Sequence, residues 1–318
     1  MSNKISLHIG INEVDPGHYL SSKDKGWKGE LDGCESDALA MKAMATAHGF
    51  QASALLTRQA TRKAVQAAIR EAARTLPPGG HFLLTYSGHG SQVRDVSGDE
   101  LEDADLVLAS PSKSQKQELG AKGFSFGEEP ASTEAVSDNR DETWCLYDKQ
   151  LLDDELWALW AEFQEGVNIL IFSDSCHSGT VSKGLEETLT AGQEGMQPRI
   201  VPRATLGFTY RTHKDFYDGL QLRPDEPRPV VKARVRLFSG CLDQQSSFED
   251  TESDPPQGYF TRSVLKALEE GAFANYDEFF ERIKANLDPG AALLQTPHHT
   301  VFGGKDGKGD GRLPFFGF

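Results

Sequence analysis

Short apolar runs alternate with amphipathic segments along most of the chain. The runs are rich in Ile, Val, Leu and Phe, and their length is typical of buried β-strands rather than of core helices. They cover residues 5–11, 52–56, 81–86, 167–173 and 235–239. Because helical patterns lie between these runs, successive strands need crossover connections. The pattern therefore predicts a mainly parallel sheet that is covered by helices on both faces.

The amphipathic segments repeat apolar residues at the spacing of one helix face. The predicted helices cover residues 33–48, 61–74, 153–163, 259–270 and a segment after Asn275. Asn275, with Glu278 three positions later, is typical of a helix N-terminus. Trp157 and Trp160 belong to the apolar stripe of their helix, so we expect them in the core rather than in a binding surface.

The regular pattern is lost in residues 91–143 and 180–229. The first segment is rich in Asp, Glu, Ser and Gly, and the second contains scattered Pro, Gly and Arg. We expect both segments to be long loops or insertions. Loops of this length inside a compact domain are usually functional, so substrate contacts or processing should be sought in them.

The charge balance narrows the classes of partner. The 318 residues include 48 acidic and 33 basic side chains, which gives a net charge of −15. Nucleic-acid binding depends on clustered Lys and Arg, so we expect no nucleic-acid partner. No apolar run approaches the roughly 18 residues of a membrane helix, and the first residues lack the pattern of a signal peptide. We therefore expect a cytoplasmic protein with no membrane partner.

The cysteines lie far apart, at positions 34, 145, 176 and 241. Their spacing fits neither a zinc site nor the disulfide framework of a small secreted protein. Reduced thiols are therefore expected, and one of them is a candidate nucleophile.

Two predicted strands end next to residues that can perform covalent catalysis. The strand at 81–86 is followed by Ser87, Gly88 and His89. The strand at 167–173 is followed, three residues after its end, by Cys176. The carboxyl ends of parallel strands share one edge of a sheet, so His89 can serve as the base for a Cys176 nucleophile. Gly90 leaves its backbone N–H open for an oxyanion. The alternative is a buried structural cysteine and an unrelated surface histidine.

The same residues resemble a known family. YSGHG at 86–90 and DSCHSG at 174–179 are similar to the paired motifs of metacaspases and orthocaspases, which belong to the caspase clan. Further similarities are GCESDA at 33–38, DDEL at 153–156, LFSGCLDQQSSFE at 237–249, GYFT at 258–261 and QTP at 295–297. The QACRG-like sequence of caspases themselves is absent, which favours the metacaspase branch.

This resemblance implies a caspase-like three-layer α/β/α sandwich whose mainly parallel sheet has about six strands. The chain would form a single catalytic domain over residues 1–318. In family terms it has a large-subunit-like part at 1–180, an insertion or linker at 181–229 and a small-subunit-like part at 230–318.

The resemblance also implies a cysteine endopeptidase that cleaves protein or peptide substrates after Arg or Lys. His89 would be the base, Cys176 the nucleophile, and the backbone N–H groups of Gly90 and Cys176 would hold the oxyanion. The specificity pocket carried over by motif contains Cys34, Asp37, Ser87 and Asp174. Two carboxylates beside the nucleophile would pair with a guanidinium or ammonium group and reject an acidic side chain.

Simpler roles remain open for both pocket carboxylates. Asp37 also fits a solvated charge in the first turn of a helix. Asp174 also fits a loop carboxylate that caps the following turn.

Many members of the family are activated by calcium, and Asp153 and Asp154 match the metal-ligand motif. Carboxylate oxygens are suitable ligands for this cation. Lys183, however, stands near the position where a further carboxylate is expected, so we expect no required cofactor. The alternative role of Asp153 and Asp154 is to cap a helix.

Two rival functions remain open at this point. One is a gingipain-like or separase-like peptidase with a different specificity, and the other is a caspase-fold scaffold that acts mainly by binding. Self-processing is a further expectation, because the segment 180–229 offers basic residues to a protease that accepts them. These are Lys183, Arg199, Arg203, Arg211, Lys214 and Arg223.

Overall fold

The computed structural model describes residues 3–94, 140–176, 195–221, 227–242 and 245–304. Its central sheet has six strands in the order β14-β11-β9-β5-β1-β4. They are β1 (Lys4–Gly10), β4 (Gln51–Leu56), β5 (His81–Ser87), β9 (Asn168–Asp174), β11 (Arg234–Ser239) and β14 (His298–Gly303). All neighbours pair in parallel except β14, which is antiparallel to β11. The structure confirms the predicted fold class.

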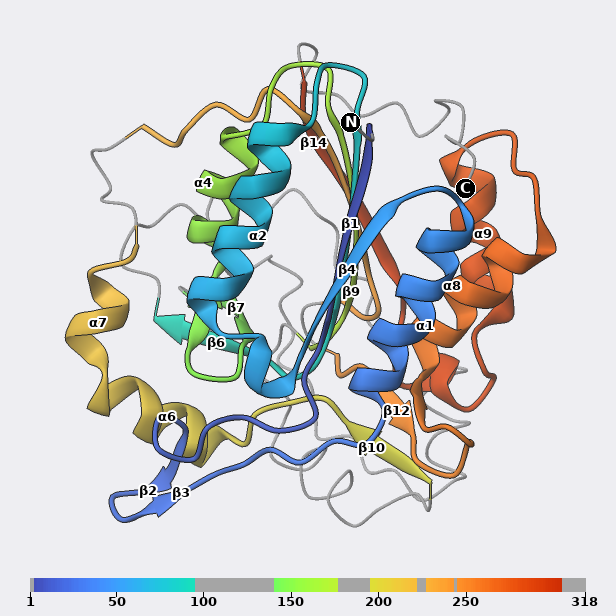
Figure 1. Ribbon diagram of the computed structural model, residues 1–318. Helices are drawn as coiled ribbons and strands as arrows, with labels where there is room; N and C mark the ends of the chain where they lie inside the picture. The colour runs from blue at the N-terminus through green and yellow to red at the C-terminus, as the bar shows by residue number, and fades with distance from the viewer. Residues whose placement is uncertain (1–2, 95–139, 177–194, 222–226, 243–244, 305–318) are drawn as a thin grey trace, which may run out of the picture.

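Helices cover both faces of this sheet (Figure 1). One layer contains α2 (Arg62–Thr75) and α4 (Asp153–Ala161). The other contains α1 (Cys34–Ala47), α8 (Tyr259–Glu270) and α9 (Tyr276–Asn286). Successive side chains of a strand point to opposite faces, so β9 places Ile169 and Ile171 in one core and Leu170 and Phe172 in the other. This two-sided burial explains why the strands are apolar throughout.

Local signals place the predicted helices within a few residues of their observed ends. The side chain of Asn275 accepts a hydrogen bond from the backbone N–H of Glu278 at 2.9 Å and so caps α9. Trp160 is buried and Trp157 packs against the same core, as the apolar stripe predicted. Among the described residues no helix is long and apolar enough to cross a membrane.

Smaller elements lie beyond the carboxyl edge of the central strands (Figure 1). One antiparallel sheet contains β6, β7 and β8, a second contains β10, β12 and β13, and β2 pairs with β3. The bounds are β2 (Leu20–Ser22), β3 (Lys25–Gly26), β6 (Gly90–Arg94), β7 (Arg140–Cys145), β8 (Gln150–Leu152), β10 (Met196–Pro198), β12 (Phe248–Asp250) and β13 (Gln257–Gly258). The remaining helices are α6 (Arg203–Thr212), α7 (Lys214–Asp218) and the 3₁₀ turns η1 (Thr57–Gln59) and η3 (Ala291–Leu293).

Of the two alternatives expected for 91–143 and 180–229, long loops are wrong for the described parts of both segments, whereas insertions stay a prediction. The first contributes to β6 and β7, and the second contains β10, α6 and α7. Short strands such as β6 and β10 form because they pair with β7 and β12, which are distant in sequence and leave no local periodic signal. Residues 95–139 and 177–194, and with them Lys183, lie outside the described residues.

Candidate active site

The predicted histidine and cysteine follow the carboxyl ends of two neighbouring strands, at equivalent positions in the strand pairing. Ser87 of β5 pairs with Asp174 of β9, and His89 and Cys176 each come two residues later. A Cβ atom added to Gly90 would overlap the carbonyl group of Cys176, so only glycine permits this close approach of the two chains. The fold therefore brings His89, Gly90 and Cys176 together at one edge of the sheet.

His89 is buried, and the hydrogen bond of one ring nitrogen fixes the role of the other. Nε2 lies 3.0 Å from the carbonyl oxygen of Gly29. A carbonyl only accepts, so Nε2 carries the proton, and Nδ1 of the neutral ring has a lone pair. Nδ1 makes no hydrogen bond among the described residues. Burial lowers the pKa of His89 to about 4, although the carbonyls of Gly29 and Arg199 favour the protonated ring. His89 is therefore a neutral potential base at pH 7.

Cys176 is buried and reduced, and its sulfur faces the segment that leads into β12. The backbone N–H of Ser247 donates to Sγ of Cys176 at 2.9 Å. An N–H group directed at sulfur stabilises the negative charge that a thiol nucleophile acquires. Ser247 is thus a supporting residue of the site that the motif reading did not identify.

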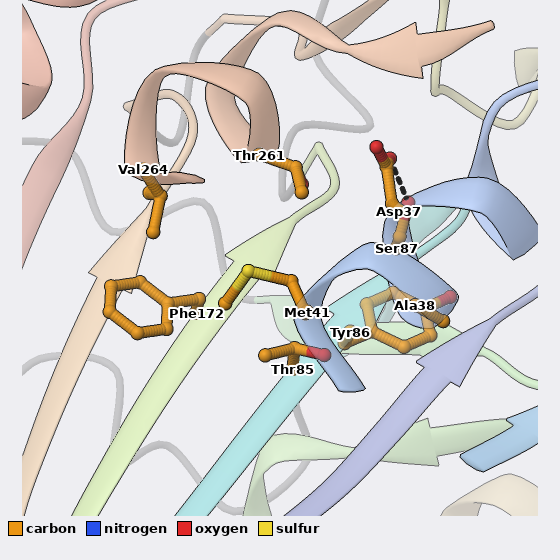
Figure 2. A pocket seen from close by; sticks show the side chains of 9 residues that line it. All are labelled: Asp37, Ala38, Met41, Thr85, Tyr86, Ser87, Phe172, Thr261 and Val264. Atoms are coloured by element: carbon orange, nitrogen blue, oxygen red, sulfur yellow. Dashed lines mark hydrogen bonds between the residues drawn. The ribbon is translucent and has the colours of Figure 1, made fainter. Parts of the chain in front are cut away.

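Three buried carboxylates form a pocket next to this pair. Asp37 lies in the first turn of α1, Asp174 ends β9, and Glu249 lies on β12. Their exposed fractions are 1%, 1% and 0%. Asp37 is therefore not the solvated helix charge that the sequence left open. Ser87 Oγ donates to Asp37 Oδ2 at 2.7 Å (Figure 2), and the thiol of Cys34 lies 3.9 Å from Oε2 of Glu249.

The guanidinium group of Arg199 fills this pocket. Its nitrogens lie 2.8 Å from Oδ2 of Asp37, 3.1 Å from Oδ2 of Asp174 and 3.2 Å from Oε2 of Glu249. Arg199 has an exposed fraction of 0%. A Cβ atom on Gly258 would overlap both Asp174 and the guanidinium, so this glycine leaves the space that Arg199 occupies. The pocket is thus matched to a planar cation in shape and in charge.

Burial raises the pKa of Asp37 to about 6, and the positive charge of Arg199 opposes that rise. The neighbouring charge of Asp174 acts in the same direction as burial. Backbone donors also compensate the buried charge, because the N–H of Gly258 lies 3.1 Å from both oxygens of Asp37. The pocket retains its carboxylates because each has such partners.

The backbone of Arg199, like its side chain, makes hydrogen bonds within the site. Its N–H donates to the carbonyl oxygen of Ser247 at 2.9 Å, and its own carbonyl oxygen accepts from the N–H of Gly90 at 3.3 Å. The preceding strand β10 pairs antiparallel with β12. Residues 196–199 therefore lie as an added strand across the site, a mode by which many proteins bind extended peptides.

A small cavity adjoins Asp37 and Ser87 of the pocket (Figure 2). Its polar wall contains Asp37, Ser87 and Thr261, and its other wall is mainly apolar. Thr261 donates to Oδ2 of Asp174 from its backbone N–H at 2.9 Å and from its hydroxyl at 2.7 Å. These bonds orient Asp174 toward Arg199.

The two carboxylates predicted as metal ligands begin α4, away from this pocket in the sequence and in the fold. Burial and the adjacent Asp154 raise the pKa of Asp153 well above its ordinary value. Oδ1 of Asp154 lies 3.5 Å from the guanidinium of Arg228. Within the described parts of the chain, no group of at least three His, Cys, Asp or Glu could hold a metal ion. The expectation that calcium is not required therefore stays a prediction.

Several functional residues were not identified from the sequence. Glu249 and Ser247 lie in the LFSGCLDQQSSFE segment, and Gly258 and Thr261 lie in GYFT. Both segments resemble the family, but the resemblance gives these four residues no role. The available signal is that the acidic Glu249 directly follows the apolar Phe248.

Comparisons with known proteins agree with this geometry. The family model described as Caspase domain matches residues 4–301. Metacaspase-1 of Saccharomyces cerevisiae is 24% identical over 298 residues, which cover 83% of this chain and 58% of the yeast protein. Metacaspase-1 of Kluyveromyces lactis is 23% identical over 313 residues, which cover 89% of this chain and 62% of that protein. The chain thus spans about three fifths of the length of these relatives.

A solved structure extends the similarity. The crystal structure of a protein from Geobacter sulfurreducens is 35% identical, with a TM-score of 0.68. The match covers 95% of this chain and 94% of that one. Because the family model spans most of the sequence and the histidine and cysteine motifs meet at one edge of the sheet, the chain belongs to the caspase-domain family of peptidases.

Proposed function

We propose that the protein is a cysteine endopeptidase that cleaves peptide bonds after Arg or Lys, with Cys176 as the nucleophile and His89 as the base. One observation carries this proposal. Arg199 lies in the site as the residue before a scissile bond would, with its side chain among three carboxylates. Its carbonyl oxygen meanwhile accepts the N–H of Gly90.

The proposed reaction is acyl transfer. Nδ1 of His89 takes the proton of the Cys176 thiol as sulfur attacks the carbonyl carbon. The N–H groups of Gly90 and Cys176 stabilise the resulting oxyanion. His89 then gives its proton to the leaving amine, and a thioester remains on Cys176. Water activated by His89 hydrolyses this thioester and restores the thiol.

The charge of the pocket supports the specificity. A guanidinium or ammonium group entering it would replace the contacts that Arg199 makes with Asp37, Asp174 and Glu249. An acidic side chain would face like charges in a desolvated space, and a neutral one would leave the carboxylates without a counter-charge. Basic residues are therefore the only class of side chain that satisfies the buried carboxylates.

The segment of the chain that now occupies the site is also its nearest substrate. We expect cleavage of the Arg199–Ile200 bond, since Arg199 is already bound and no diffusion is needed. Until that bond is cut or the strand moves out, the same contacts exclude other peptides. We further expect cytoplasmic activity on protein substrates, because all four cysteines are reduced.

The test is a panel of fluorogenic peptides that differ only in the residue before the cleaved bond. Arg and Lys peptides should be hydrolysed, whereas Gln and Asp peptides should not. Cys176→Ala is the control for a contaminating protease. Efficient cleavage after Asp would show that the charge of the pocket has been misinterpreted. No cleavage of any peptide, either by the intact chain or after its Arg199–Ile200 bond has been cut, would favour a scaffold.

A further inference from the structure

A tryptophan outside the predicted motifs packs against the histidine of the site. Trp27 directly follows β3, and the centroid of its indole lies 4.9 Å from the centroid of the His89 imidazole, with the two planes at 51°. The indole also packs against the core beneath α2 and α4. Resting on the proposed function, we propose that Trp27 is a positioning residue for the reaction, because its indole holds the imidazole of His89 in the orientation that proton transfer requires.

The indole contacts the hydrogen-bond partner of His89 as well as the imidazole itself. The carbonyl oxygen of Gly29 accepts the proton of Nε2 at 3.0 Å. A Cβ atom on Gly29 would lie 2.6 Å from the nearest carbon of the six-membered ring of Trp27, so the indole lies directly against this backbone. Gly29 has a φ of +55°, a left-handed conformation that glycine adopts without strain. Trp27 therefore limits the movement of both partners in the hydrogen bond.

Trp27 belongs to a segment that has anchors of its own. The N–H of Trp27 donates to the carbonyl oxygen of Tyr19 at 2.7 Å. Tyr19 is fully buried, and its hydroxyl donates to the carbonyl oxygen of Leu146 at 2.8 Å. The N–H of Leu20 donates to the hydroxyl of Thr209 on α6 at 2.9 Å. The indole is thus supported by the core and by α6, which is the kind of second support that a precisely oriented site requires.

Rotation of the imidazole ring is what the indole prevents. The Cβ–Cγ torsion of histidine is broad and roughly two-fold, so the ring has two arrangements that differ by a half turn. A half turn exchanges Nδ1 with Cδ2, and it would put a carbon atom where the reaction needs the base nitrogen. The hydrogen bond to Gly29 holds the ring at Nε2, whereas Nδ1 makes no hydrogen bond among the described residues. The packing of Trp27 on the ring therefore supplies a second restraint on the orientation of His89.

The first test compares kcat and KM for an Arg peptide coumarin in the wild-type protein, Trp27→Leu and Trp27→Phe. Samples are compared at the same extent of Arg199–Ile200 cleavage, so that access to the pocket is equal. We expect kcat to fall by about 10- to 100-fold in Trp27→Leu, because the base is no longer held in place. KM should stay nearly unchanged, since the carboxylates that bind the arginine are not altered. Trp27→Phe keeps an aromatic ring against His89 and should recover most of kcat.

The matched control is Trp157→Leu. Trp157 packs against the same core as Trp27 but lies on α4, outside the site. Both truncations therefore remove apolar contacts with this core, and only Trp27→Leu should lower kcat. Trp27→Met, with an unbranched and adaptable side chain, takes its place if circular dichroism shows that the leucine variant is unfolded. An unchanged kcat in the folded Trp27 variant, or an equal fall in Trp157→Leu, would overturn the proposal.

The second test does not depend on turnover. In a Cys176→Ala background with ¹⁵N-labelled histidine, the nitrogen NMR signals of His89 are assigned by their loss in His89→Gln. At neutral pH we expect one protonated and one unprotonated nitrogen, because Nε2 donates to Gly29. Trp27→Leu should move the two signals toward each other as the freed ring samples the other tautomer, whereas Trp157→Leu should not. Unchanged signals in Trp27→Leu would refute the positioning role. If the wild-type protein cleaves no Arg peptide, the proposed peptidase activity fails, and the nitrogen signals still decide this inference.

Discussion

The carbonyl oxygen of Arg199 accepts a hydrogen bond from the backbone N–H of Gly90 at 3.3 Å. Gly90 in turn lies so close to Cys176 that no side chain fits between them. In the proposed mechanism, the N–H group of Gly90 that would hold the oxyanion is thus the one that already contacts the Arg199–Ile200 peptide bond.

Removal of the nucleophile or the base should abolish peptide hydrolysis without unfolding the protein. Cys176→Ala removes the sulfur atom that attacks the peptide carbonyl. His89→Ala removes the group that carries the proton, which should lower the rate roughly 100- to 10,000-fold. His298→Ala, at the start of β14 and outside the site, is the control. Activity is measured on an Arg peptide and folding by circular dichroism. Turnover at the wild-type rate by purified Cys176→Ala would show that Cys176 is not the nucleophile.

The pocket carboxylates should determine the preference for charge. Asp37→Ala and Asp174→Ala each remove one partner of a buried ion pair, which costs about 2–5 kcal/mol in transition-state binding of Arg substrates. Glu249→Gln should narrow the preference for an Arg peptide over its neutral citrulline analogue. Glu252→Gln, the same change at an exposed position three residues later, should leave this preference intact. An unchanged ratio in Glu249→Gln would remove Glu249 from the pocket.

Self-cleavage should occur between Arg199 and Ile200. Intact-mass spectrometry over time should show fragments 1–199 and 200–318, absent in Cys176→Ala. Arg199→Gln should prevent the cut because it removes the charge that the pocket binds, whereas Arg203→Gln, in the first turn of α6, should not. A chain that stays uncut and yet hydrolyses Arg peptides at full rate would exclude cleavage as an activation step. It would not contradict the roles proposed for His89 and Cys176.

The pH dependence should report Asp37. Its pKa is raised to about 6, so the carboxyl takes up a proton as the pH falls through that value. The occupied pocket then loses one negative charge, and Arg peptides should bind less tightly. The value of about 6 belongs to the pocket with a guanidinium in place, and the pKa of Asp37 is higher when that cation is absent. We therefore expect KM for Arg peptides to rise as the pH falls toward about 6 and to level off below it, while a citrulline peptide shows no such rise. Asp37→Asn should remove the inflection. A KM that is flat between neutral and acidic pH would contradict this assignment.

Calcium should not be required. Asp154 already faces the cation of Arg228, and the described residues contain no set of three metal-binding side chains. Activity on an Arg peptide is measured against free Ca²⁺ from micromolar to millimolar, with a chelator as the baseline. A steep rise from a chelated baseline near zero would restore Asp153 and Asp154 as ligands.

The sequence by itself determined the architecture and the position of the dyad. Continuous apolar runs are strands buried on both faces, and amphipathic segments between them force parallel crossovers, so β1, β5 and β9 could be predicted from local pattern alone. Parallel strands end at a common edge, so the sequence places His89 and Cys176 at the same edge of the sheet. The pairing of β5 with β9 then makes them neighbours. These features depend on short-range periodicity and on one topological rule.

Only the tertiary structure decided what surrounds the dyad. β10 has no periodic signal of its own and exists because it pairs with β12, some fifty residues later in the chain. In the sequence, Arg199 is one of several basic residues in a segment expected to be a loop. It is the one that enters the pocket because residues 196–198 pair with β12 and so carry it to the three carboxylates. Glu249 becomes a pocket residue because β12 directs it at the guanidinium of Arg199, which also contacts Asp37 and Asp174. Such placements come from contacts between distant segments, which a local sequence pattern does not encode.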